Sequence, residues 1–508
     1  MNRAEAISSL AAETFDVLVV GGGIVGAGVA FDAATRGLRV ALVEREDFGS
    51  GTSSRSSKLI HGGLRYLRRL DIGLVREGLR ERRELMRMAP HLVRQQEFLV
   101  PRFSSLRLGV RAGLTLYDVL SAGSGLPRHR SIDPDEVSEL APALRKSDGG
   151  LAYWDATTDD ARLVWGIVRS AAEAGAVVAN YAELRVINTS PGRAAGGVVV
   201  DKESGSDIEV RARAVVNATG VWADEVRRME SADASMGVRP SRGTHLVFRR
   251  SRVPVDAALV LPSPDRRFVF VVPWENDTTL VGTTDVEHAG DLDQPEAEDA
   301  EIDYLLGVVN DVLETPVSLD DAIATYSSLR PLVKGSGRRT KDISRRHKVL
   351  VGRAGVVTVV GGKLTTWRPM AIEAVDAALG SGEFEHRPRT KMHELRLAGA
   401  AFREGVIPAL EAVLHDLGLD KSHAPRLYER YGAHAAEVLK LVRTDPSLAK
   451  QLHAELPYMR AEAEYAIHSE AARTTDDVLA RRLRVTVTSS DYGTSCAPWV
   501  WERLLLVR

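Results

Sequence analysis

Cysteine is almost absent from this 508-residue sequence, whose single example is Cys496. A chain with one cysteine forms no internal disulfide, and it lacks the clustered cysteines of structural zinc sites. We therefore expect no metal site, and a reducing compartment such as the cytoplasm.

An excess of one charge and long apolar runs are lacking as well. The 67 Lys and Arg residues nearly balance the 69 Asp and Glu residues, so no basic excess points to nucleic acid. No run of about eighteen apolar residues predicts a transmembrane helix, and the first residues contain no apolar secretion signal. These absences leave open a peripheral contact with a membrane. With 44% hydrophobic residues, the chain can bury the cores of two or three domains.

The first motif is a strand–turn–helix junction near the N-terminus. Residues 16–20 (DVLVV) have the continuous apolar pattern of a buried parallel strand, and residues 24–36 have helical spacing. Between them a Gly-x-Gly-x-x-Gly pattern allows a tight turn and close approach of a pyrophosphate; its glycines are Gly21, Gly23 and Gly26. A second strand, 38–43, ends at Glu44, whose carboxylate can accept from ribose hydroxyls. This context predicts a dinucleotide at the helix N-terminus.

Three later junctions favour FAD among the dinucleotides. Small residues follow predicted strands in NATG (217–220), GTTD (282–285) and GGKLT (361–365). In two-domain flavoproteins the last kind of junction caps the flavin, and a helix N-terminus there stabilises negative charge on the ring. The predicted cofactor-binding residues in these segments are Ala218, Thr219, Gly220, Gly362, Lys363, Leu364 and Thr365.

Hydrophobic periodicity outlines the remaining elements. Helices are expected at 73–89, at 160–175 and from the last Gly-Gly pair to residue 378. Further strands are expected at 177–180, 194–216, 268–272, 278–282 and 356–360. Residues 380–391 form a plausible linker, and the sequence beyond it has helical composition to about residue 484.

Long ordered motifs then make the sequence resemble a known family. The motifs are GTSSRSSKLIHGGLRYL (51–67), NATGVW (217–222), RGTHLVF (242–248), VGTTD (281–285), YSSLRPL (326–332) and GGKLTTWR (361–368). They are similar to those of the FAD-dependent, quinone-linked glycerol-3-phosphate dehydrogenases, over most of the chain.

The resemblance implies an α/β fold. A glutathione-reductase-type FAD-binding domain would be interleaved with an antiparallel-sheet substrate domain, and a helical C-terminal domain would follow. The expected boundaries are 14–90, 150–225 and 345–380 for the FAD-binding domain, 91–149 and 226–344 for the substrate domain, and 390–508 for the helical domain. The family continues with a further helix after the region that matches Leu479 to Trp501, so we expect a shorter or altered C-terminal domain here.

The activity implied by the resemblance is oxidation of sn-glycerol 3-phosphate to dihydroxyacetone phosphate, by hydride transfer to FAD. Electrons would then pass to a membrane quinone. A phosphate dianion needs fixed cations, and Arg330 is our first candidate because a guanidinium offers a planar fork to phosphate oxygens. Arg65, Tyr66 and Lys363 are further candidates for the substrate pocket.

The proton of the substrate hydroxyl needs a base, and histidine has the suitable pKa. Two of the thirteen histidines lie in the motifs, His61 in LIHGG and His245 in RGTHLVF. Either residue could be the base, with the other orienting flavin or substrate. We favour His245 for substrate contact and His61 for proximity to the flavin, while a structural histidine remains the alternative for each.

The loop from Thr52 to Gly62 is predicted to serve the cofactor. Its hydroxyls and backbone N–H groups suit the pyrophosphate and ribityl chain, its lysine adds charge, and its glycine lets the backbone approach the ring. The residues concerned are Thr52, Ser53, Ser54, Ser57, Lys58, His61 and Gly62. Arg68 and Arg69 more simply suit a solvated helix face.

A peripheral membrane contact and a homodimer complete the expected partners. Residues 101–120 mix apolar side chains with three arginines, a composition suited to an anionic membrane surface. The same pattern also suits a helix that covers the substrate domain. The expected location is therefore the cytoplasm, at the inner face of the plasma membrane.

Three other functions remain to be weighed. An oxidase of the same fold would pass electrons to oxygen, and no single residue separates it from a dehydrogenase. An FAD-dependent RNA-modifying protein would need a basic face and working cysteines. A flavin-binding sensor without turnover would not need Arg330, His245 and Lys363 together.

Overall fold

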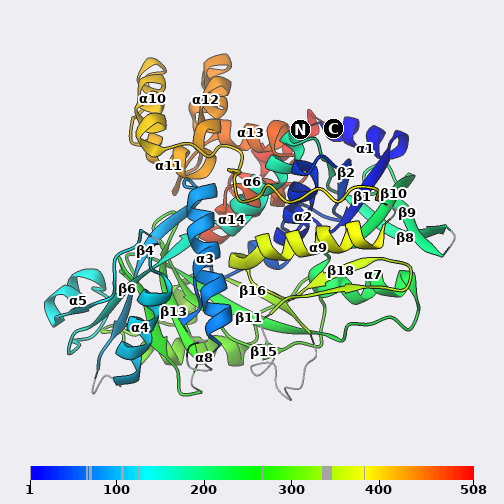
Figure 1. Ribbon diagram of the computed structural model, residues 1–508. Coiled ribbons are helices and arrows are strands. Elements are labelled where there is room, and N and C mark those ends of the chain that lie inside the picture. Colours follow the sequence, from blue (N-terminus) through cyan, green and yellow to red (C-terminus); the bar gives the residue numbers. More distant parts are fainter. Residues whose placement is uncertain are drawn as a thin grey trace.

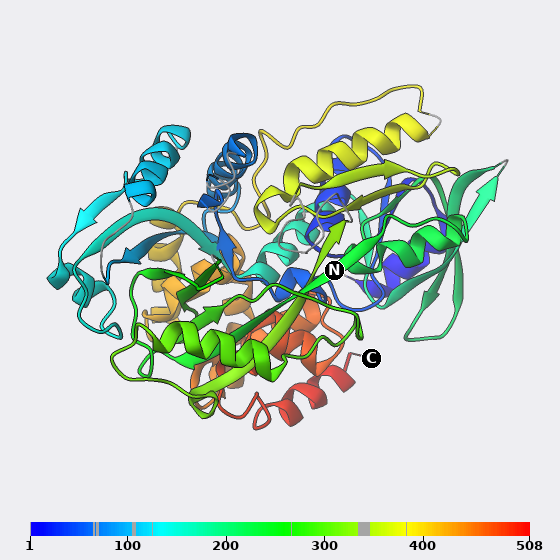
Figure 2. The same ribbon diagram turned by 90° about the horizontal axis from the view of Figure 1, so that it is seen from below.

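The computed structural model describes residues 2–64, 67, 71–103, 108–123, 125–190, 192–265, 267–333, 346–382 and 384–507. Two large sheets lie side by side, and the C-terminal helices, orange to red, lie against both of them (Figures 1 and 2).

The first sheet is built on the predicted parallel strands. β1 (Thr14–Val20) pairs in parallel with β2 (Val40–Val43) and β10 (Asp207–Asn217), while β7 (Val177–Ala179) and β18 (Val357–Val360) extend the parallel order on either side. β17 (Lys348–Val351) adds an antiparallel edge. The hairpin of β8 (Ala182–Ser190) and β9 (Arg193–Asp201) continues from β10.

Helices cover both faces of this sheet. α2 (Ile24–Thr35), α6 (Asp160–Glu173) and α9 (Trp367–Ser381) share one apolar core with one face. α2 packs closely because it is rich in small residues, and a Cβ at Gly28 would lie 2.5 Å from the Trp367 ring. α1 (Arg3–Ala12), α7 (Ala223–Glu230) and the β8–β9 hairpin enclose the other face.

The second sheet is almost wholly antiparallel, with one parallel pair between β4 and β12. Its order is β15-β11-β14-β13-β12-β4-β6-β3, with β16 also paired to β11 and β5 to β6. The strands are β3 (Leu59–Ile60), β4 (Val93–Pro101), β5 (Arg130–Ile132), β6 (Gly150–Thr158), β11 (Val238–Arg249), β12 (Ala258–Pro262), β13 (Phe268–Trp274), β14 (Thr278–Gly282), β15 (Val286–Glu287) and β16 (Ala322–Val333).

Sheet membership differs from the expectation in two of the FAD-binding segments. The segment 14–90 contains β3, which pairs with β6 in the second sheet. The expected FAD-binding segment 150–225 begins with β6, yet β6 pairs with β4 along its whole length in the second sheet. Its burial on both faces is the pattern of a central strand in either sheet, so the sequence did not reveal the difference. The first sheet's share of this segment therefore begins at α6.

Helices also cover the second sheet. α5 (Pro134–Leu140) and α8 (Asp299–Asn310) lie on one face, and α3 (Ile72–Met88) and α4 (Leu108–Leu120) lie on the other. α3 begins where the Asp71 side chain accepts from the Leu74 N–H and ends just before Pro90.

The segment considered for membrane contact contributes α4. Leu114 and Tyr117 are buried against the second sheet, so these two residues cover the substrate domain and do not face a membrane. Leu116 and Val119 on the same helix are exposed. Residues 104–107 of the segment lie outside the described residues.

The C-terminal region is helical, as expected, except for one hairpin. Its helices are α10 (Arg403–Asp416), α11 (His423–Tyr431), α12 (Ala435–Thr444), α13 (Arg460–Ser469), the π-helix Asp477–Arg482, α14 (Val485–Thr488) and α15 (Ala497–Leu505). The exception is the pair β19 (Gln451–His453) and β20 (Leu456–Met459). None of the described helices is long and apolar enough to cross a membrane.

Candidate active site

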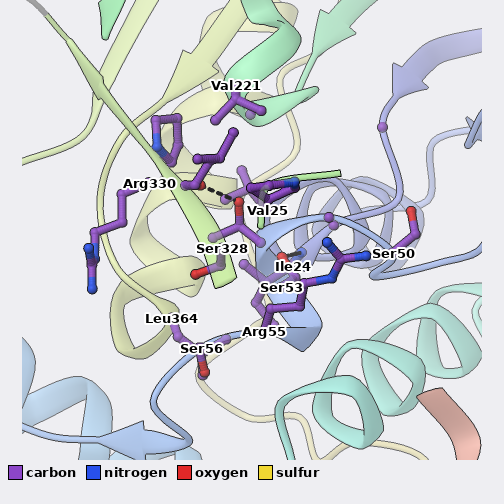
Figure 3. Close-up of a pocket in the computed structure, with 18 of the residues that line it drawn as sticks. Ile24, Val25, Ser50, Ser53, Arg55, Ser56, Val221, Ser328, Arg330 and Leu364 are labelled. Atoms are coloured by element: carbon purple, nitrogen blue, oxygen red, sulfur yellow. Dashed lines mark hydrogen bonds between the residues drawn. The ribbon is translucent and has the colours of Figure 1, made fainter. Parts of the chain in front are cut away.

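A cavity of about 1150 Å³ opens between the two sheets. Its walls come from the β1–α2 turn, the loop 50–64, strands β11 and β16, the segment 361–365 and the C-terminal segment 474–476. Figure 3 shows Ser53 and Arg55 on one side of this cavity and Arg330 on the other. The volume exceeds the roughly 300–1,000 Å³ of ordinary small-molecule pockets, so an elongated ligand fits.

Parallel pairing brings three of the predicted junctions to one edge of the first sheet. Val20 is in register with Asn217, and Asn217 is in register with Thr358. The residues that follow these strands therefore lie together at the carboxyl ends, where α/β proteins bind their ligands. Gly21, Gly23, Ala218, Thr219, Gly220 and segment 361–365 all line the cavity.

The fingerprint glycines form a cradle that side chains would fill. Gly21 has φ +102°, and a Cβ there would lie 2.8 Å from the Ala218 carbonyl oxygen. A Cβ at Gly26 would overlap the Gly21 carbonyl oxygen, so Gly26 serves the close packing of α2 and not the cavity wall. Gly23 caps α2 without a side chain, and the Ile24 N–H donates to Ser53 Oγ at 2.9 Å. The helix N-terminus thus faces the cavity, as binding of a diphosphate requires.

Glu44 is fixed at the rim of this cradle. Its two carboxylate oxygens accept from the Gly22 N–H at 2.6 Å and from the Glu46 N–H at 2.9 Å. Burial raises its pKa, and the two backbone donors oppose that shift. Each oxygen keeps a second lone pair for a ribose hydroxyl.

His245 faces the cavity from β11. Leu246 and Phe248 pack towards α8, so His245 lies on the opposite face of the strand. Its imidazole stacks on the Tyr326 ring with centroids 4.8 Å apart, and a Cβ at Gly282 would overlap the imidazole from the other neighbouring strand.

The surroundings of His245 favour the neutral form of its imidazole. Burial holds its pKa well below the ordinary value, and the positive charges of Arg330 and Lys58 lower it further. Nε2 lies 2.8 Å from Ser57 Oγ, in hydrogen-bond contact.

Arg330 lies on β16, on the same face as Tyr326. Its guanidinium donates to Thr283 Oγ1 at 3.0 Å and to the Thr284 carbonyl at 3.1 Å. Gly243 leaves space for it, because a Cβ there would lie 2.7 Å from Arg330 Nη1. The guanidinium is therefore held in one orientation at the cavity wall.

The segment from Gly361 to Thr365 closes the same end of the cavity. Gly361 and Gly362 have φ values of +86° and +74°, which only glycine adopts readily. Thr365 Oγ1 accepts from the His61 N–H at 3.2 Å, so this segment and the loop 50–64 are joined. His61, Lys363 and Leu364 all line the cavity.

Several predicted residues of the loop 52–62 do line the cavity, namely Thr52, Ser53, Ser57 and His61. Three others do not, and the structure corrects their expected roles. Lys58 is buried behind the wall with its ammonium 2.8 Å from Asp160, so its charge is not available to a pyrophosphate. Ser54 is buried beside it, and its carbonyl accepts from Lys58 Nζ.

Gly62 is the third correction. A Cβ there would lie 2.6 Å from Leu79 Cγ and from the Tyr117 hydroxyl oxygen. Its glycine identity therefore allows close packing against α3 and α4, and the neighbouring Gly63 lines the cavity instead. Arg65, Tyr66, Arg68 and Arg69 lie outside the described residues.

Arg55 was not predicted as a site residue, yet it lines the cavity beside Ser50 and Ser53 (Figure 3). Burial and the nearby Arg481 lower its pKa. Within the part of the chain that the structure describes, no carboxylate makes a salt bridge with its guanidinium. The sequence could have indicated a role for Arg55 in the cavity, because it is the one cationic residue within the serine-rich segment 53–57.

A second missed feature is a contact that joins the two sheets beside the cavity. The Arg45 guanidinium lies 4.5 Å from the centre of the Trp222 ring and forms an ion pair with Asp293. All three residues line the cavity. The sequence around Arg45, Trp222 and Asp293 did not indicate this contact, because the two residues of the ion pair are about 250 positions apart.

Comparisons with known proteins agree with this geometry. Residues 16–368 match the family model described as FAD dependent oxidoreductase, and residues 390–505 match the C-terminal domain of alpha-glycerophosphate oxidase. The chain is 41% identical over 505 residues to glycerol-3-phosphate dehydrogenase 2 of Mycobacterium tuberculosis, covering 98% of this chain and 86% of that protein.

Two solved structures bear on the fold. Glycerol-3-phosphate dehydrogenase from Bacillus halodurans, complexed with FAD, matches with a TM-score of 0.81 and 27% identity over 99% of this chain and 93% of that one. L-alpha-glycerophosphate oxidase from Mycoplasma pneumoniae matches with a TM-score of 0.57 and 17% identity, over 75% and 97%, and shares the fold alone.

The cradle and the family agree on the cofactor. The glycine turn that excludes side chains, the N-terminus of α2 at the cavity and the fixed Glu44 suit the ADP half of FAD, and the cavity has room for the flavin half. The expected cofactor, FAD, and the expected α/β fold with a helical C-terminal domain are confirmed. The chain belongs to the family of FAD-dependent glycerol-3-phosphate dehydrogenases.

Proposed function

We propose that this protein oxidises sn-glycerol 3-phosphate to dihydroxyacetone phosphate and passes the electrons to a membrane quinone. One observation carries the proposal: Arg330 and His245 come from neighbouring strands to the same cavity that holds the dinucleotide cradle. FAD, when bound, supplies the acceptor for the hydride on C2 of the substrate. The relatives' names support the substrate.

Arg330 binds the phosphate in this proposal. Its guanidinium is fixed by Thr283 and by the Thr284 carbonyl, so little side-chain entropy is lost when an anion binds. Lys363, which lines the same cavity, adds a second cation to the pocket.

His245 takes the proton of the C2 hydroxyl. A base must be unprotonated before the reaction, and the depressed pKa of His245 meets that condition at neutral pH. A bound phosphate dianion would offset the charge of Arg330 and so raise this pKa. That shift makes the imidazole a stronger proton acceptor when substrate is present. His61 is the alternative base, and loss of activity in His61→Gln but not in His245→Gln would favour it.

The variant Arg330→Ala tests the phosphate contact. Loss of charge-assisted hydrogen bonds worth about 1.5–3 kcal/mol each predicts a KM for glycerol 3-phosphate raised about 100-fold, with FAD content unchanged. Arg239→Ala is the matched control, because Arg239 lies on β11 but pairs with the exposed Glu287. An unchanged KM in Arg330→Ala would remove Arg330 from the substrate site.

The electron acceptor is tested separately. We expect turnover with a soluble quinone and little peroxide in air, since the close relative is named a dehydrogenase. The oxidase that shares the fold motivates the alternative. Oxygen consumption that matches substrate oxidation, with stoichiometric peroxide, would establish an oxidase instead.

Peripheral membrane association is the last part of the proposal. Leu116 and Val119 are exposed on α4, and Arg111 lies on the same helix. Flotation with anionic vesicles should carry the protein upward, and Val119→Glu should weaken that flotation. Equal flotation of both proteins would place any membrane contact elsewhere.

A further inference from the structure

A buried cluster of charges lies directly behind the loop that carries Ser57. It consists of Lys58, Asp159, Asp160 and Arg484, each at most 4% exposed. The first three belong to the segments around α6 and the second sheet. Arg484 belongs to the C-terminal domain, where it precedes α14 in a left-handed conformation with φ +61°.

Arg484 contacts every part of this cluster except the lysine. Its guanidinium donates to Asp159 Oδ1 at 2.7 Å and to the Ser54 carbonyl at 3.0 Å, and it forms an ion pair with Asp160. Lys58 Nζ reaches the same Ser54 carbonyl and the same Asp160 carboxylate, each at 2.8 Å. Two cations from different domains thus hold one carbonyl and one carboxylate.

The clamped loop leads straight to the active site. The Ser56 N–H donates to Asp160 Oδ2 at 2.8 Å, and the Ser56 carbonyl accepts from the Tyr326 hydroxyl at 2.9 Å. The next residue, Ser57, contacts His245 Nε2. Displacement of the loop would therefore shift both neighbours of the His245 imidazole, the Ser57 hydroxyl and the stacked Tyr326 ring.

Only arginine can make this set of contacts. A guanidinium has five N–H donors in a rigid fork, and here they reach a carbonyl and two carboxylates at once. A lysine would keep the charge but would bring a single nitrogen to the site. Because the cluster is buried, a carboxylate left without its partner would be strongly unfavourable, and the loop would shift to relieve it.

We propose that Arg484, supplied by the C-terminal domain, is a positioning residue for the active site, acting through the loop Ser54–Ser57 on His245. This inference depends on the proposed function only where kcat for glycerol 3-phosphate is measured. It gives the C-terminal domain a part in catalysis, although no atom of Arg484 lines the cavity.

The chain offers a matched control two residues away. Arg482 is equally buried and joins the same two domains through Asp47, at 2.7 and 2.9 Å, but none of its hydrogen bonds reaches the loop. We expect Arg484→Lys and Arg482→Lys to lower the melting temperature to a similar extent. Only Arg484→Lys should lower kcat, by about 10-fold or more, because small misplacements of a catalytic group are costly.

A double-mutant cycle with Ser57→Ala tests the route of the effect. If Arg484 acts through Ser57, Arg484→Lys should change kcat less than about 3-fold in the Ser57→Ala background. Visible circular dichroism of the bound flavin and FAD affinity give readouts that do not need turnover. Both should change in Arg484→Lys and stay at the wild-type value in Arg482→Lys.

The outcomes are distinct. Equal kinetics and equal flavin spectra of the two lysine variants would overturn the proposal, as would full additivity with Ser57→Ala. If the wild type fails to oxidise glycerol 3-phosphate, the proposed function falls, while the flavin spectra still decide the role of Arg484. If Arg484→Lys does not fold, Asp160→Asn takes its place, because it keeps an acceptor for Ser56 and removes one of the two carboxylate charges that hold Arg484.

Discussion

Alanine at position 243 would displace Arg330 without removing it. The new Cβ would overlap Arg330 Nη2 and would lie 2.7 Å from both Arg330 Nη1 and Thr283 Oγ1, whereas ordinary contacts begin at 3.4 Å. Thr283 Oγ1 must therefore retreat by about 0.7 Å, and the guanidinium must retreat further. The hydrogen bond of 3.0 Å between Arg330 and Thr283 joins the two displaced groups and should break.

The expected magnitude follows from the phosphate contact. Misalignment that weakens one charge-assisted hydrogen bond costs about 1.5–3 kcal/mol, which corresponds to a KM about 10- to 150-fold higher. FAD content should not change, because Gly243 does not line the cavity. Steady-state kinetics with glycerol 3-phosphate and a soluble quinone measure the effect.

Gly307→Ala is the control for this prediction. It adds a methyl group on α8 of the same sheet region, where no atom of the described residues lies within 4 Å. A Gly243→Ala protein with wild-type KM and a demonstrably shifted Arg330 would refute the assignment of Arg330 to the phosphate.

Two further predictions concern the loop 52–58. Arg55→Gln should weaken binding of FAD to the apoprotein about 10-fold or more, because a charge-assisted contact to the diphosphate is lost. Riboflavin has no phosphate, so its affinity should not change. Equal losses of affinity for both ligands would refute a phosphate contact. Burial lowers the pKa of Lys58 from 10.5 to about 8, with a further contribution from Arg484. Between these pH values the unfolded chain binds more protons than the native one, so Lys58 makes stability rise with pH, by at most about 1.4 kcal/mol per unit. The difference in melting temperature between the wild type and Lys58→Met should therefore shift in favour of the wild type from pH 8 to pH 10. A constant difference would contradict the lowered pKa of the buried Lys58.

The dinucleotide end of the site was predictable because its signals are local. Gly21, Gly23 and Glu44 each follow a strand with unmistakable apolar pattern, and parallel strands that neighbour each other end at one edge. The same rule brought Ala218 and Gly362 to the cavity. The positions of these residues along the sequence were sufficient to predict that they meet, because the parallel sheet brings the ends of neighbouring strands together.

The substrate end was less predictable because its contacts are long-range. Lys58 lies in a hydroxyl-rich loop of the kind that binds phosphate, yet its partner Asp160 comes 102 residues later. Gly62 resembled a glycine that approaches a ring, but its close neighbours are on α3 and α4. Arg484 gave no signal at all, since its partners belong to another domain.

We propose that this protein oxidises glycerol 3-phosphate with FAD as the first acceptor. The most direct measurement is the visible absorbance of the purified, FAD-containing protein after anaerobic addition of sn-glycerol 3-phosphate, with glycerol as the control. The flavin absorbance should bleach with glycerol 3-phosphate and not with glycerol. Unchanged absorbance in a protein shown to hold FAD would contradict the assignment of the substrate.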